Sequence, residues 1–438
     1  MAQRNVKVWA AIAVGILAVL AAVAALTLPW LLGQPIGRPT PSDSPGETPP
    51  GTTPSPGSSG SPGAEASTTP SGESSPSSAP ATTSAPLPED RAAAVLASMT
   101  LEQRVGQVVM VSSPTAGPDG AALTALRQLH IGNVFLKGRT DAGAPGVSAA
   151  VAALKGQVTP DATRGVGQFI ATDQEGGQVQ ILRGPGFSAI PSALDQGGMD
   201  LGALRSAAAG WGRQLAAVGV NVNLAPVLDT VPSAAFAPQN IPIGHYQRNY
   251  GFTPESVSSH GIAFAQGMAD TGVAAASKHF PGLGRVTANT DTSTDVTDAA
   301  TGRHDAYVAP FADAIRAGVP WVMVSNAFYP AIDPDHYAVF SPTVIGGMLR
   351  GDLGFRGIVV SDDVCDAGQL AGFAPEHRGA DFLAAGGTMV LCTNQQLAPR
   401  VWSGIADRAK ADPAFAKLVD AAALAVLEAK DRAGLLPR

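Results

Sequence analysis

Short apolar runs alternate with longer helical stretches along residues 89–438. The runs consist mainly of Val, Ile, Leu, Phe, Ala and Met and are too short for an ordinary helix, which is typical of buried strands. Eight strands are predicted, at residues 106–112, 132–137, 167–173, 219–228, 272–278, 320–325, 357–361 and 387–393. Helices are predicted around them, at residues 89–97, 119–129, 145–157, 201–218, 254–271, 306–317, 341–352 and 375–385. This alternation predicts an α/β fold, a (β/α)8 TIM barrel, and a doubly wound sheet is the alternative.

The chain that follows the eighth predicted strand is about 45 residues long. It has room for one or two closing helices, whereas a second catalytic domain needs more residues. We therefore expect residues 89–438 to form a single catalytic domain. Every catalytic group would then come from this barrel or from a partner chain.

The N-terminus has a different pattern. Residues 8–32 contain no charged side chain, and Arg4 and Lys7 precede them. At 1.5 Å per residue, a helix of this length spans the roughly 30 Å hydrocarbon core of a bilayer. Basic residues before the span predict a cytoplasmic N-terminus. We predict a cytoplasmic basic segment at 1–7 and a transmembrane signal-anchor at 8–32, and a cleaved signal peptide is the alternative.

Residues 33–88 consist almost entirely of Pro, Ser, Thr, Gly and Ala. Such a composition buries too little apolar area to offset the entropy lost on ordering, so we predict a disordered linker. Together, anchor and linker predict a single-pass protein of the cell membrane whose barrel lies outside the cytoplasm.

Charge and motifs exclude several function classes. The net charge is -7, and no basic run stands out beyond the N-terminus, so we expect no nucleic-acid partner. The seven His are scattered and form no HExxH motif, and Gly282-Leu283-Gly284 lacks the third glycine of a dinucleotide-binding loop. We expect no metal and no cofactor, and we expect a monomer.

Polar residues follow six consecutive predicted strands. They are Asp173 to Gly177, Asn223 to Asp229, Lys278-His279, Ser325-Asn326, Ser361-Asp362-Asp363 and Thr393-Asn394. In a barrel enzyme the chemistry gathers at the carboxyl ends of the strands. Paired carboxylates at facing strand ends suit cleavage of a glycosidic bond, which needs a nucleophile and a general acid.

Five motifs carry a resemblance to a known family. They are Asp173-Gln174-Glu175-Gly176-Gly177-Gln178-Val179-Gln180, Asn223-Leu224-Ala225-Pro226-Val227-Leu228-Asp229, Arg248-Asn249-Tyr250-Gly251, Lys278-His279-Phe280-Pro281-Gly282 and Gly357-Ile358-Val359-Val360-Ser361-Asp362-Asp363. Together they resemble the family 3 glycoside hydrolases, specifically the single-domain β-N-acetylglucosaminidases. The resemblance covers nearly all of residues 90–435.

The resemblance implies roles for individual residues. Asp362 would be the nucleophile of a retaining mechanism and form a covalent glycosyl intermediate, whereas a purely structural Asp362 would cap the next helix. Sugar hydroxyls would be bound by Asp173, Arg248, Lys278 and His279, for which ion pairing or packing is the alternative. Supporting roles fall to Asp229, Asn289 and Asp363. Asp229 would contact the substrate directly or only orient Lys278 or a loop.

The sequence departs from the family pattern in the loop after the fifth strand. The family usually reads K-H-F-P-G-H-G and then D-S-H, where an Asp-His pair in a mobile loop is the acid/base. Here the first loop His is Leu283, and the triplet aligns with Asn289-Thr290-Asp291, so Asp291 stands where the acid/base His is usual. A second departure is Ile181, which stands where the family usually has an arginine. Arg183, two residues later, could take the place of that arginine.

Three interpretations of the changed loop follow. In the first, Asp291 is itself the acid/base, which requires its pKa to rise from about 3.9 toward 6–7. In the second, another group acts, and the nearest candidates are Asp295, Asp298 and His304. In the third, the protein binds glycan and cleaves it poorly, since loss of a general acid costs about 10²–10⁴ in rate.

The remaining features have two interpretations each. Cys365 follows the seventh predicted strand and Cys392 lies on the eighth, so the two thiols can pair in an oxidising compartment or stay free and buried. Tyr246, Tyr250 and Trp321 can stack on a sugar or pack in the core.

From these observations we expect an exported retaining β-N-acetylhexosaminidase that acts on a glycan or muropeptide substrate. It would remove terminal β-N-acetylglucosamine from peptidoglycan fragments in cell-wall turnover. A β-glucosidase-type hydrolase of the same family and a weakly active glycan-binding protein are the alternatives.

Overall fold

A computed structural model describes residues 88–437 of the 438-residue chain. The predicted cytoplasmic segment 1–7, the transmembrane span 8–32 and all but the last residue of the predicted linker lie outside the described residues. Among residues 88–437, no helix combines the length and the apolar character needed to cross a membrane.

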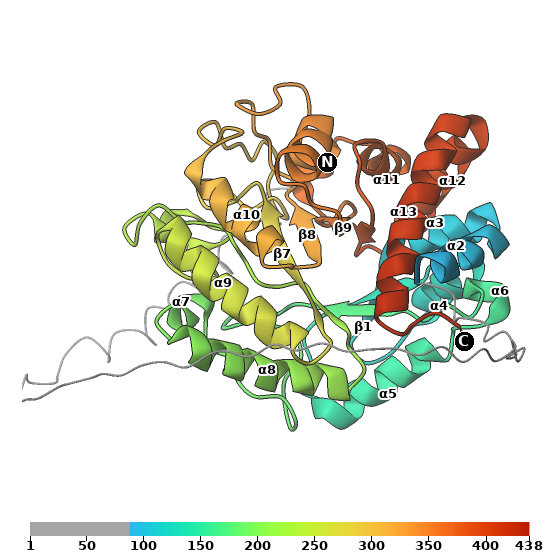
Figure 1. The fold of residues 1–438 in the computed structure, drawn as a ribbon, viewed down its shortest axis with the longest axis horizontal. Helices are drawn as coiled ribbons and strands as arrows, with labels where there is room; N and C mark the ends of the chain where they lie inside the picture. The colour runs from blue at the N-terminus through green and yellow to red at the C-terminus, as the bar shows by residue number, and fades with distance from the viewer. Residues whose placement is uncertain (1–87, 438) are drawn as a thin grey trace, which may run out of the picture. The chain divides into compact units, whose positions relative to one another are not determined.

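Eight parallel strands form a nearly closed barrel (Figure 1), and each pairs with its neighbours in chain order. They are β1 (Val109–Pro114), β2 (Asn133–Lys137), β3 (Phe169–Thr172), β6 (Val222–Asn223), β7 (Ala274–Phe280), β8 (Trp321–Val324), β9 (Ile358–Ser361) and β10 (Val390–Cys392). β10 pairs with β1, and a bridge between Val360 and Met389 joins β9 to β10. The strand order excludes the doubly wound alternative and confirms the predicted barrel.

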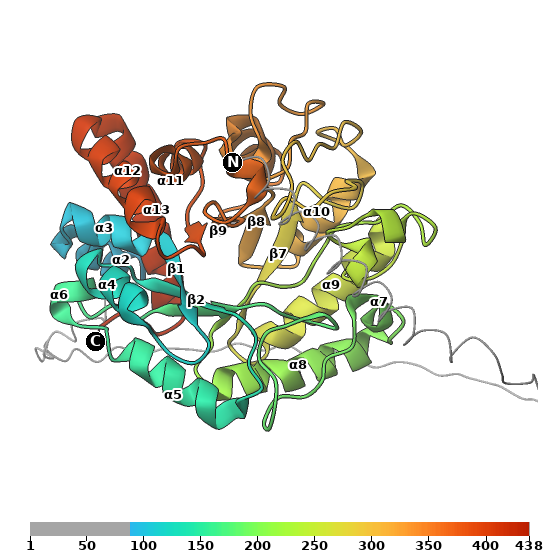
Figure 2. The ribbon, with the colours of Figure 1, turned by 180° about the vertical axis from the view of Figure 1, so that it is seen from behind.

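The predicted helices are also present. They correspond to α2 (Pro88–Ser98), α4 (Gly120–Gln128), α5 (Gly143–Lys155), α8 (Leu201–Ala217), α9 (Pro254–Ala269), α10 (Ala309–Arg316), the π-helix η6 (Thr343–Asp352) and α11 (Pro375–Ala384). Two closing helices follow β10, namely α12 (Ala398–Ala411) and α13 (Pro413–Arg432). Figures 1 and 2 show α8 and α9 side by side on the outside of the sheet.

Two predicted strand boundaries are wrong. The predicted strand 106–112 begins inside helix α3 (Leu101–Gln107), because Thr100 and Gln103 form a reciprocal capping box that starts a helix there. The predicted strand 219–228 is regular only over β6. Pro226 has no N–H to give to a ladder, and the chain returns to the sheet through a single bridge between Val227 and Lys278.

Alternate residues of each strand face opposite sides of the sheet. The side chains that point into the barrel form one buried cluster, which includes Met110, Phe135, Phe169, Leu224, Trp321, Met323, Val360 and Leu391. Their neighbours along each strand point outward against the helices and belong to a second cluster, which includes Val111, Val134, Ile170, Val322 and Val359. Since both faces are buried, the strands are mostly apolar except near their ends, which explains why they appear as apolar runs in the sequence.

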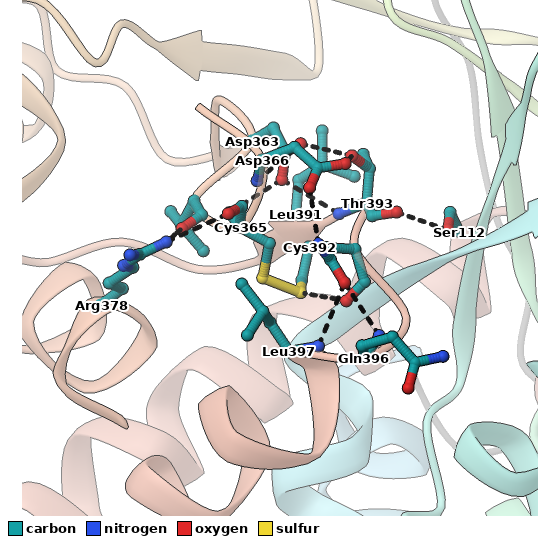
Figure 3. Close-up of a disulfide and its surroundings, with 12 residues drawn as sticks. Ser112, Asp363, Cys365, Asp366, Arg378, Leu391, Cys392, Thr393, Gln396 and Leu397 are labelled. Atoms are coloured by element: carbon teal, nitrogen blue, oxygen red, sulfur yellow. Dashed lines mark hydrogen bonds between the residues drawn. A yellow bond between two sulfur atoms is a disulfide. The ribbon is translucent and has the colours of Figure 1, made fainter. Parts of the chain in front are cut away.

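Cys365 and Cys392 form a disulfide between the loop after β9 and strand β10 (Figure 3). Their Cα atoms are 5.0 Å apart, within the usual range for a disulfide. Of the two states left open by the sequence, the structure has the paired one. The bond fixes the loop that begins with Asp362 to the neighbouring strand.

Replacing both cysteines by serine should lower the free energy of unfolding by about 3–4 kcal/mol, because the disulfide restricts the unfolded chain. The two cysteines are 27 residues apart in sequence. Unfolding in guanidinium chloride measures the effect, with the wild type in reductant as the control. Equal unfolding midpoints for the oxidised wild type and the double serine variant would show that the bond contributes no stability.

Candidate active site

A cavity of about 280 Å³ opens at the carboxyl ends of the strands. Its lining comes from β2, β7, β8 and β10 and from the segments after β3, β6, β7, β9 and β10. Eight predicted site residues line it, namely Asp173, Arg248, Lys278, His279, Asn289, Asp291, Asp362 and Asp363. The barrel thus brings together residues that are up to 190 positions apart in sequence. Asp229 is the predicted site residue that does not line the cavity.

One side of the cavity is a network of buried charges centred on Glu175. The Glu175 carboxylate accepts two hydrogen bonds from Arg248, each 2.8 Å long, and lies 2.6 Å from Nζ of Lys278. Burial raises the pKa of Glu175, but the charges of Arg248 and Lys278 outweigh burial and lower the pKa to about 2. Glu175 therefore stays ionised at any pH at which the protein would work.

Asp173 extends this network toward the open part of the cavity. Its Oδ1 accepts a hydrogen bond of 2.7 Å from Lys278. The Asp173 side chain is 24% exposed, whereas Lys278 is only 4% exposed. Asp173 is thus the member of the pair that a ligand in the cavity reaches first. Burial lowers the pKa of Lys278, but the charges of Asp173 and Glu175 outweigh burial and raise it, so the lysine stays cationic.

Glu175, the centre of this charge network, is a residue of the site that the sequence prediction missed. It lies in the Asp173–Gln180 motif, and that position was the available signal. The backbone turns back at Gly176, which has a φ of +115° and would bring a Cβ within 2.1 Å of the carbonyl oxygen of Pro191. Only glycine fits there, and the turn directs Glu175 toward Lys278 and Arg248.

His279 is oriented by Asp229. Nδ1 of His279 lies 2.7 Å from Oδ2 of Asp229, and Oδ1 of Asp229 accepts hydrogen bonds from the backbone N–H groups of His279 and Leu283. Asp229 is completely buried. Of the two predicted roles for Asp229, its contacts match the supporting role, with His279 and the start of the following loop as its partners in place of Lys278.

Asp362 follows directly after β9 and faces the same cavity. Burial raises the pKa of its carboxyl group to about 6, and the negative charges of Asp291 and Asp363 add to the increase, whereas His279 opposes it. Its Oδ1 accepts a hydrogen bond of 2.8 Å from the backbone N–H of Asp363. Among the described residues no cation forms an ion pair with Asp362, and a carboxyl group with a raised pKa in a cavity is a candidate functional group.

Asp363, which also lines the cavity, organises the loop after β9 (Figure 3). Its carboxylate accepts hydrogen bonds from the backbone N–H groups of Cys365, Asp366 and Thr393 and from the hydroxyl of Thr393. The two bonds from Thr393, which directly follows β10, join the loop to that strand, as the disulfide does. Their pattern matches the supporting role predicted for Asp363.

Asp291 lies in the long loop after β7 and lines the cavity together with Asp362. Oδ1 of Asn289 accepts a hydrogen bond of 2.9 Å from the backbone N–H of Asp291, so Asn289 shapes this turn. Asp291 is exposed, as are the other candidates for the acid/base, Asp295 and His304, and of these three only Asp291 lines the cavity.

Asp298, the third alternative acid/base, is committed to the loop. Its Oδ1 accepts hydrogen bonds from the backbone N–H groups of Ala300 and Thr301, and its Oδ2 accepts one from the hydroxyl of Thr301. It does not line the cavity either. Of the four candidate residues, only Asp291 shares the cavity with Asp362.

Several weaker predictions have a clear outcome. Arg183 donates a hydrogen bond to the carbonyl oxygen of Gln180 and does not line the cavity, so it does not replace the missing arginine. Trp321 and Tyr250 are buried in the core and Tyr246 lies outside the cavity, so none of the three can stack on a ligand there. The sequence prediction also missed Lys137 and Asp366, which form an ion pair at the rim.

Metal ligands do not gather in the described part of the chain. Among residues 88–437, no group of three or more His, Cys, Asp or Glu is arranged to hold a metal ion. The polar groups that converge on the cavity are two ion-paired cations, a histidine and several carboxylates. Such a set can hold the hydroxyl groups of a sugar by charge-assisted hydrogen bonds.

Comparison with known proteins agrees with this geometry. Residues 100–429 match the family described as "Glycosyl hydrolase family 3 N terminal domain". A β-hexosaminidase of Stenotrophomonas maltophilia is 34% identical over 266 residues, which are 59% of this chain and 76% of that protein. An uncharacterized secreted glycosyl hydrolase of Arthroderma benhamiae is 31% identical over 312 residues, 68% of this chain and 83% of that protein.

Solved structures show the same fold. The β-N-acetylhexosaminidase of Beutenbergia cavernae superimposes with a TM-score of 0.75 and 48% identity, covering 76% of this chain and 99% of that one. A family 3 β-N-acetylglucosaminidase of Paenibacillus gives a TM-score of 0.67 and 28% identity, covering 76% of this chain and 63% of that one. From the matched residues, the barrel and the arrangement of the motif residues around one cavity, this chain belongs to glycosyl hydrolase family 3.

Proposed function

We propose that this chain is an exported, membrane-anchored retaining β-N-acetylhexosaminidase that removes terminal β-linked N-acetylglucosamine from peptidoglycan-derived glycans. The observation that carries the proposal is the pair of carboxyl groups, Asp362 and Asp291, which line one polar cavity from the loops after β9 and β7. Hydrolysis with retention needs two such groups, one as nucleophile and one as acid and base.

Asp362 is the proposed nucleophile. It lies directly after a barrel strand, where rigid backbone holds it in place. Its carboxylate would attack the anomeric carbon, the glycosidic bond to the leaving oxygen would break, and a covalent glycosyl ester would form. Burial that raises the pKa of Asp362 also raises the energy of its anion, and formation of the neutral ester would relieve that cost.

Asp291 is the proposed general acid and base. As the carboxylic acid it would give its proton to the leaving oxygen, and as the carboxylate it would then take a proton from the water that hydrolyses the ester. The negative charge of Asp291 raises the pKa of Asp362, so the two carboxyl groups interact. Protonation of Asp291 would therefore ease the ionisation of Asp362, as the first step requires.

The sugar would be held by Asp173, Lys278, Arg248 and His279, which line the cavity beside Asp362. The cavity of about 280 Å³ is slightly smaller than the roughly 300–1,000 Å³ typical of ligand pockets. A small cavity of this kind suits the removal of one terminal sugar. The named relatives, a β-hexosaminidase and a β-N-acetylhexosaminidase, support N-acetylglucosamine as that sugar.

The location is proposed from residues 1–88 alone. An uncharged span at 8–32 preceded by basic residues would anchor the chain, and the following Pro- and Ser-rich linker would carry the barrel into the cell wall. Glycan fragments of peptidoglycan are then the nearest substrates that contain β-linked N-acetylglucosamine.

Substitution of the two carboxylates tests the proposed chemistry. Asp362→Asn should lower kcat by at least about 10³-fold on every substrate, because the nucleophile is lost. Asp291→Asn should lower kcat by about 10²–10⁴-fold on unactivated β-N-acetylglucosaminyl muropeptides, and by much less on a 4-nitrophenyl glycoside, whose leaving group needs no proton.

Product release by the purified protein measures both effects, and NMR of the first-formed anomer reports retention. Asp270→Asn, on the exposed surface, is the matched control. If the wild type binds these glycans and releases no sugar from them or from β-glucosides, the protein is a glycan-binding member of the family and the proposal is wrong.

The pKa of Asp362 predicts an acid limb in the pH dependence. Because the nucleophile must be ionised, kcat/KM should fall tenfold per pH unit as the pH drops below about 6. Steady-state rates on the 4-nitrophenyl glycoside between pH 4 and 8 measure this limb. If kcat/KM begins to fall only near pH 4, the Asp362 carboxyl group is not desolvated in the free protein.

The same pKa predicts a pH-dependent stability. The folded-state pKa of Asp362 is raised from 3.8 to about 6, so ionisation destabilises the fold progressively as the pH rises from about 4 to above 6. Asp362→Asn should therefore be more stable than the wild type at pH 8, by at most about 3 kcal/mol, and equally stable at pH 3.5.

Urea unfolding at both pH values measures the difference. Asp270→Asn is a control of opposite sign, because its hydrogen bond from Arg205 lowers the pKa of Asp270. A stability difference between Asp362→Asn and the wild type that stays constant with pH would contradict the assigned ionisation.

A further inference from the structure

The segment 287–295, which carries Asp291, is fixed at both of its ends. Before it, Asn240 donates a hydrogen bond of 2.7 Å to the carbonyl oxygen of Val286. After it, the side-chain amide of Gln369 pairs with both backbone groups of Val296. Oε1 accepts from the N–H at 2.8 Å, and Nε2 donates to the carbonyl oxygen at 3.0 Å.

Between these ends the segment has few contacts of its own with other elements. Among the described residues, two hydrogen bonds reach this segment from outside its own loop. The backbone N–H of Gly368 donates to the carbonyl oxygen of Asp291 at 2.9 Å, and the backbone N–H of Gln369 donates to the carbonyl oxygen of Thr290 at 3.0 Å. The other hydrogen bonds of residues 287–295 stay within the loop, such as those to Asn289. The position of Asp291 therefore depends on residues 368 and 369.

Packing at this contact is tight. Gln369 is 3% exposed, and it begins the single turn η7 (Gly368–Leu370) together with Gly368. A Cβ on Gly368 would lie 3.1 Å from the backbone nitrogen of Ser293 and 3.2 Å from the carbonyl oxygen of Asp291. The turn is thus in van der Waals contact with the backbone that carries Asp291, and a side chain at Gly368 would displace it.

The turn η7 belongs to the loop that begins with Asp362. Gly368 is six residues after Asp362, and the disulfide of Cys365 and the hydrogen bonds of Asp363 fix the backbone between them. One loop therefore carries the proposed nucleophile at its start and anchors the proposed acid at η7. The separation of the two carboxyl groups is set by this loop.

We propose that Gln369 is a positioning residue that holds the Asp291 segment over Asp362 by pairing its amide with the backbone of Val296. This inference rests on the proposed function, because it assigns Gln369 its role through Asp291. Gln369 itself does not line the cavity. Its loss should leave sugar binding intact and weaken proton transfer, which needs the acid within hydrogen-bond reach of the leaving oxygen.

The test uses Gln369→Met, which keeps the length of the side chain and removes its hydrogen bonds. We expect kcat on an unactivated β-N-acetylglucosaminyl disaccharide to fall by about 10–100-fold, since small displacements of a catalytic group are costly. On the 4-nitrophenyl glycoside the loss should stay within about threefold, and KM should change little on either substrate. Hydrogen exchange of the amides of residues 288–297 should become faster.

Gln103→Met is the matched control. Gln103 is also buried, and its amide also bonds backbone groups on two sides, Thr100 and Asp161, at the opposite end of the barrel. Gln103→Met should lose about as much stability as Gln369→Met, but its kcat should change equally on the disaccharide and on the 4-nitrophenyl glycoside. If Gln369→Met does not fold, Gly368→Ala displaces the same segment. It should show the same split between substrates, which is a larger loss of kcat on the disaccharide than on the 4-nitrophenyl glycoside.

The outcomes separate this inference from the proposed function. If Asp291→Asn shows the split between substrates and Gln369→Met does not, or if Gln103→Met shows the same split, the positioning role is wrong. Unchanged hydrogen exchange of residues 288–297 in Gln369→Met also overturns it. If Asp291→Asn shows no split, Asp291 is not the acid, and the inference fails together with that part of the proposed function.

Discussion

The buried carboxylate of Glu175, held between Lys278 and Arg248, is the interaction on which the site depends. Two charges in a low-dielectric site lose several kcal/mol of solvation each, and such pairs often add little net stability. The arrangement fixes the positions of the Lys278 and Arg248 side chains, because each must lie where it can form an ion pair with the buried Glu175 carboxylate. Lys278 is thereby presented to Asp173, and Arg248 to the cavity wall. Glu175 therefore acts on any bound sugar through its two partners.

The carboxyl group of Asp362 has a pKa shift opposite to that of Glu175. Glu175 has bonded cations, which lower its pKa to about 2, whereas Asp362 has none, and burial raises its pKa to about 6. Both groups are removed from bulk water, so the difference comes from their partners. A carboxylate with two bonded cations is a poor nucleophile, because its lone pairs are occupied. The environment thus gives two side chains with the same functional group opposite pKa shifts, and the raised pKa belongs to Asp362, the proposed nucleophile.

Much of this arrangement could be predicted from the sequence, and the exceptions have physical causes. Strands such as 320–325 were recognised because both faces of a parallel barrel are buried, which leaves uninterrupted apolar runs. Asp362 and Lys278 were recognised because strand ends converge at one face. Glu175 was missed because its partners are distant in sequence, and only the turn at Gly176 brings them together. Gln369 was missed for a related reason, since its function lies in an amide pairing with a loop backbone that no local pattern encodes.

The aspartate at position 291 makes this anchoring more important. An aspartate side chain is shorter than the histidine usual at this position in the family, so the carboxyl group of Asp291, the proposed acid, reaches less far from the backbone. The backbone must then lie closer to the substrate and deviate less, because proton transfer needs the donor within about 3.2 Å of its acceptor. A longer acidic side chain reaches the leaving oxygen from a wider range of loop positions, whereas a shorter one needs the loop backbone held in one position. Anchoring of the segment to η7, in the loop that also carries Asp362, meets that requirement.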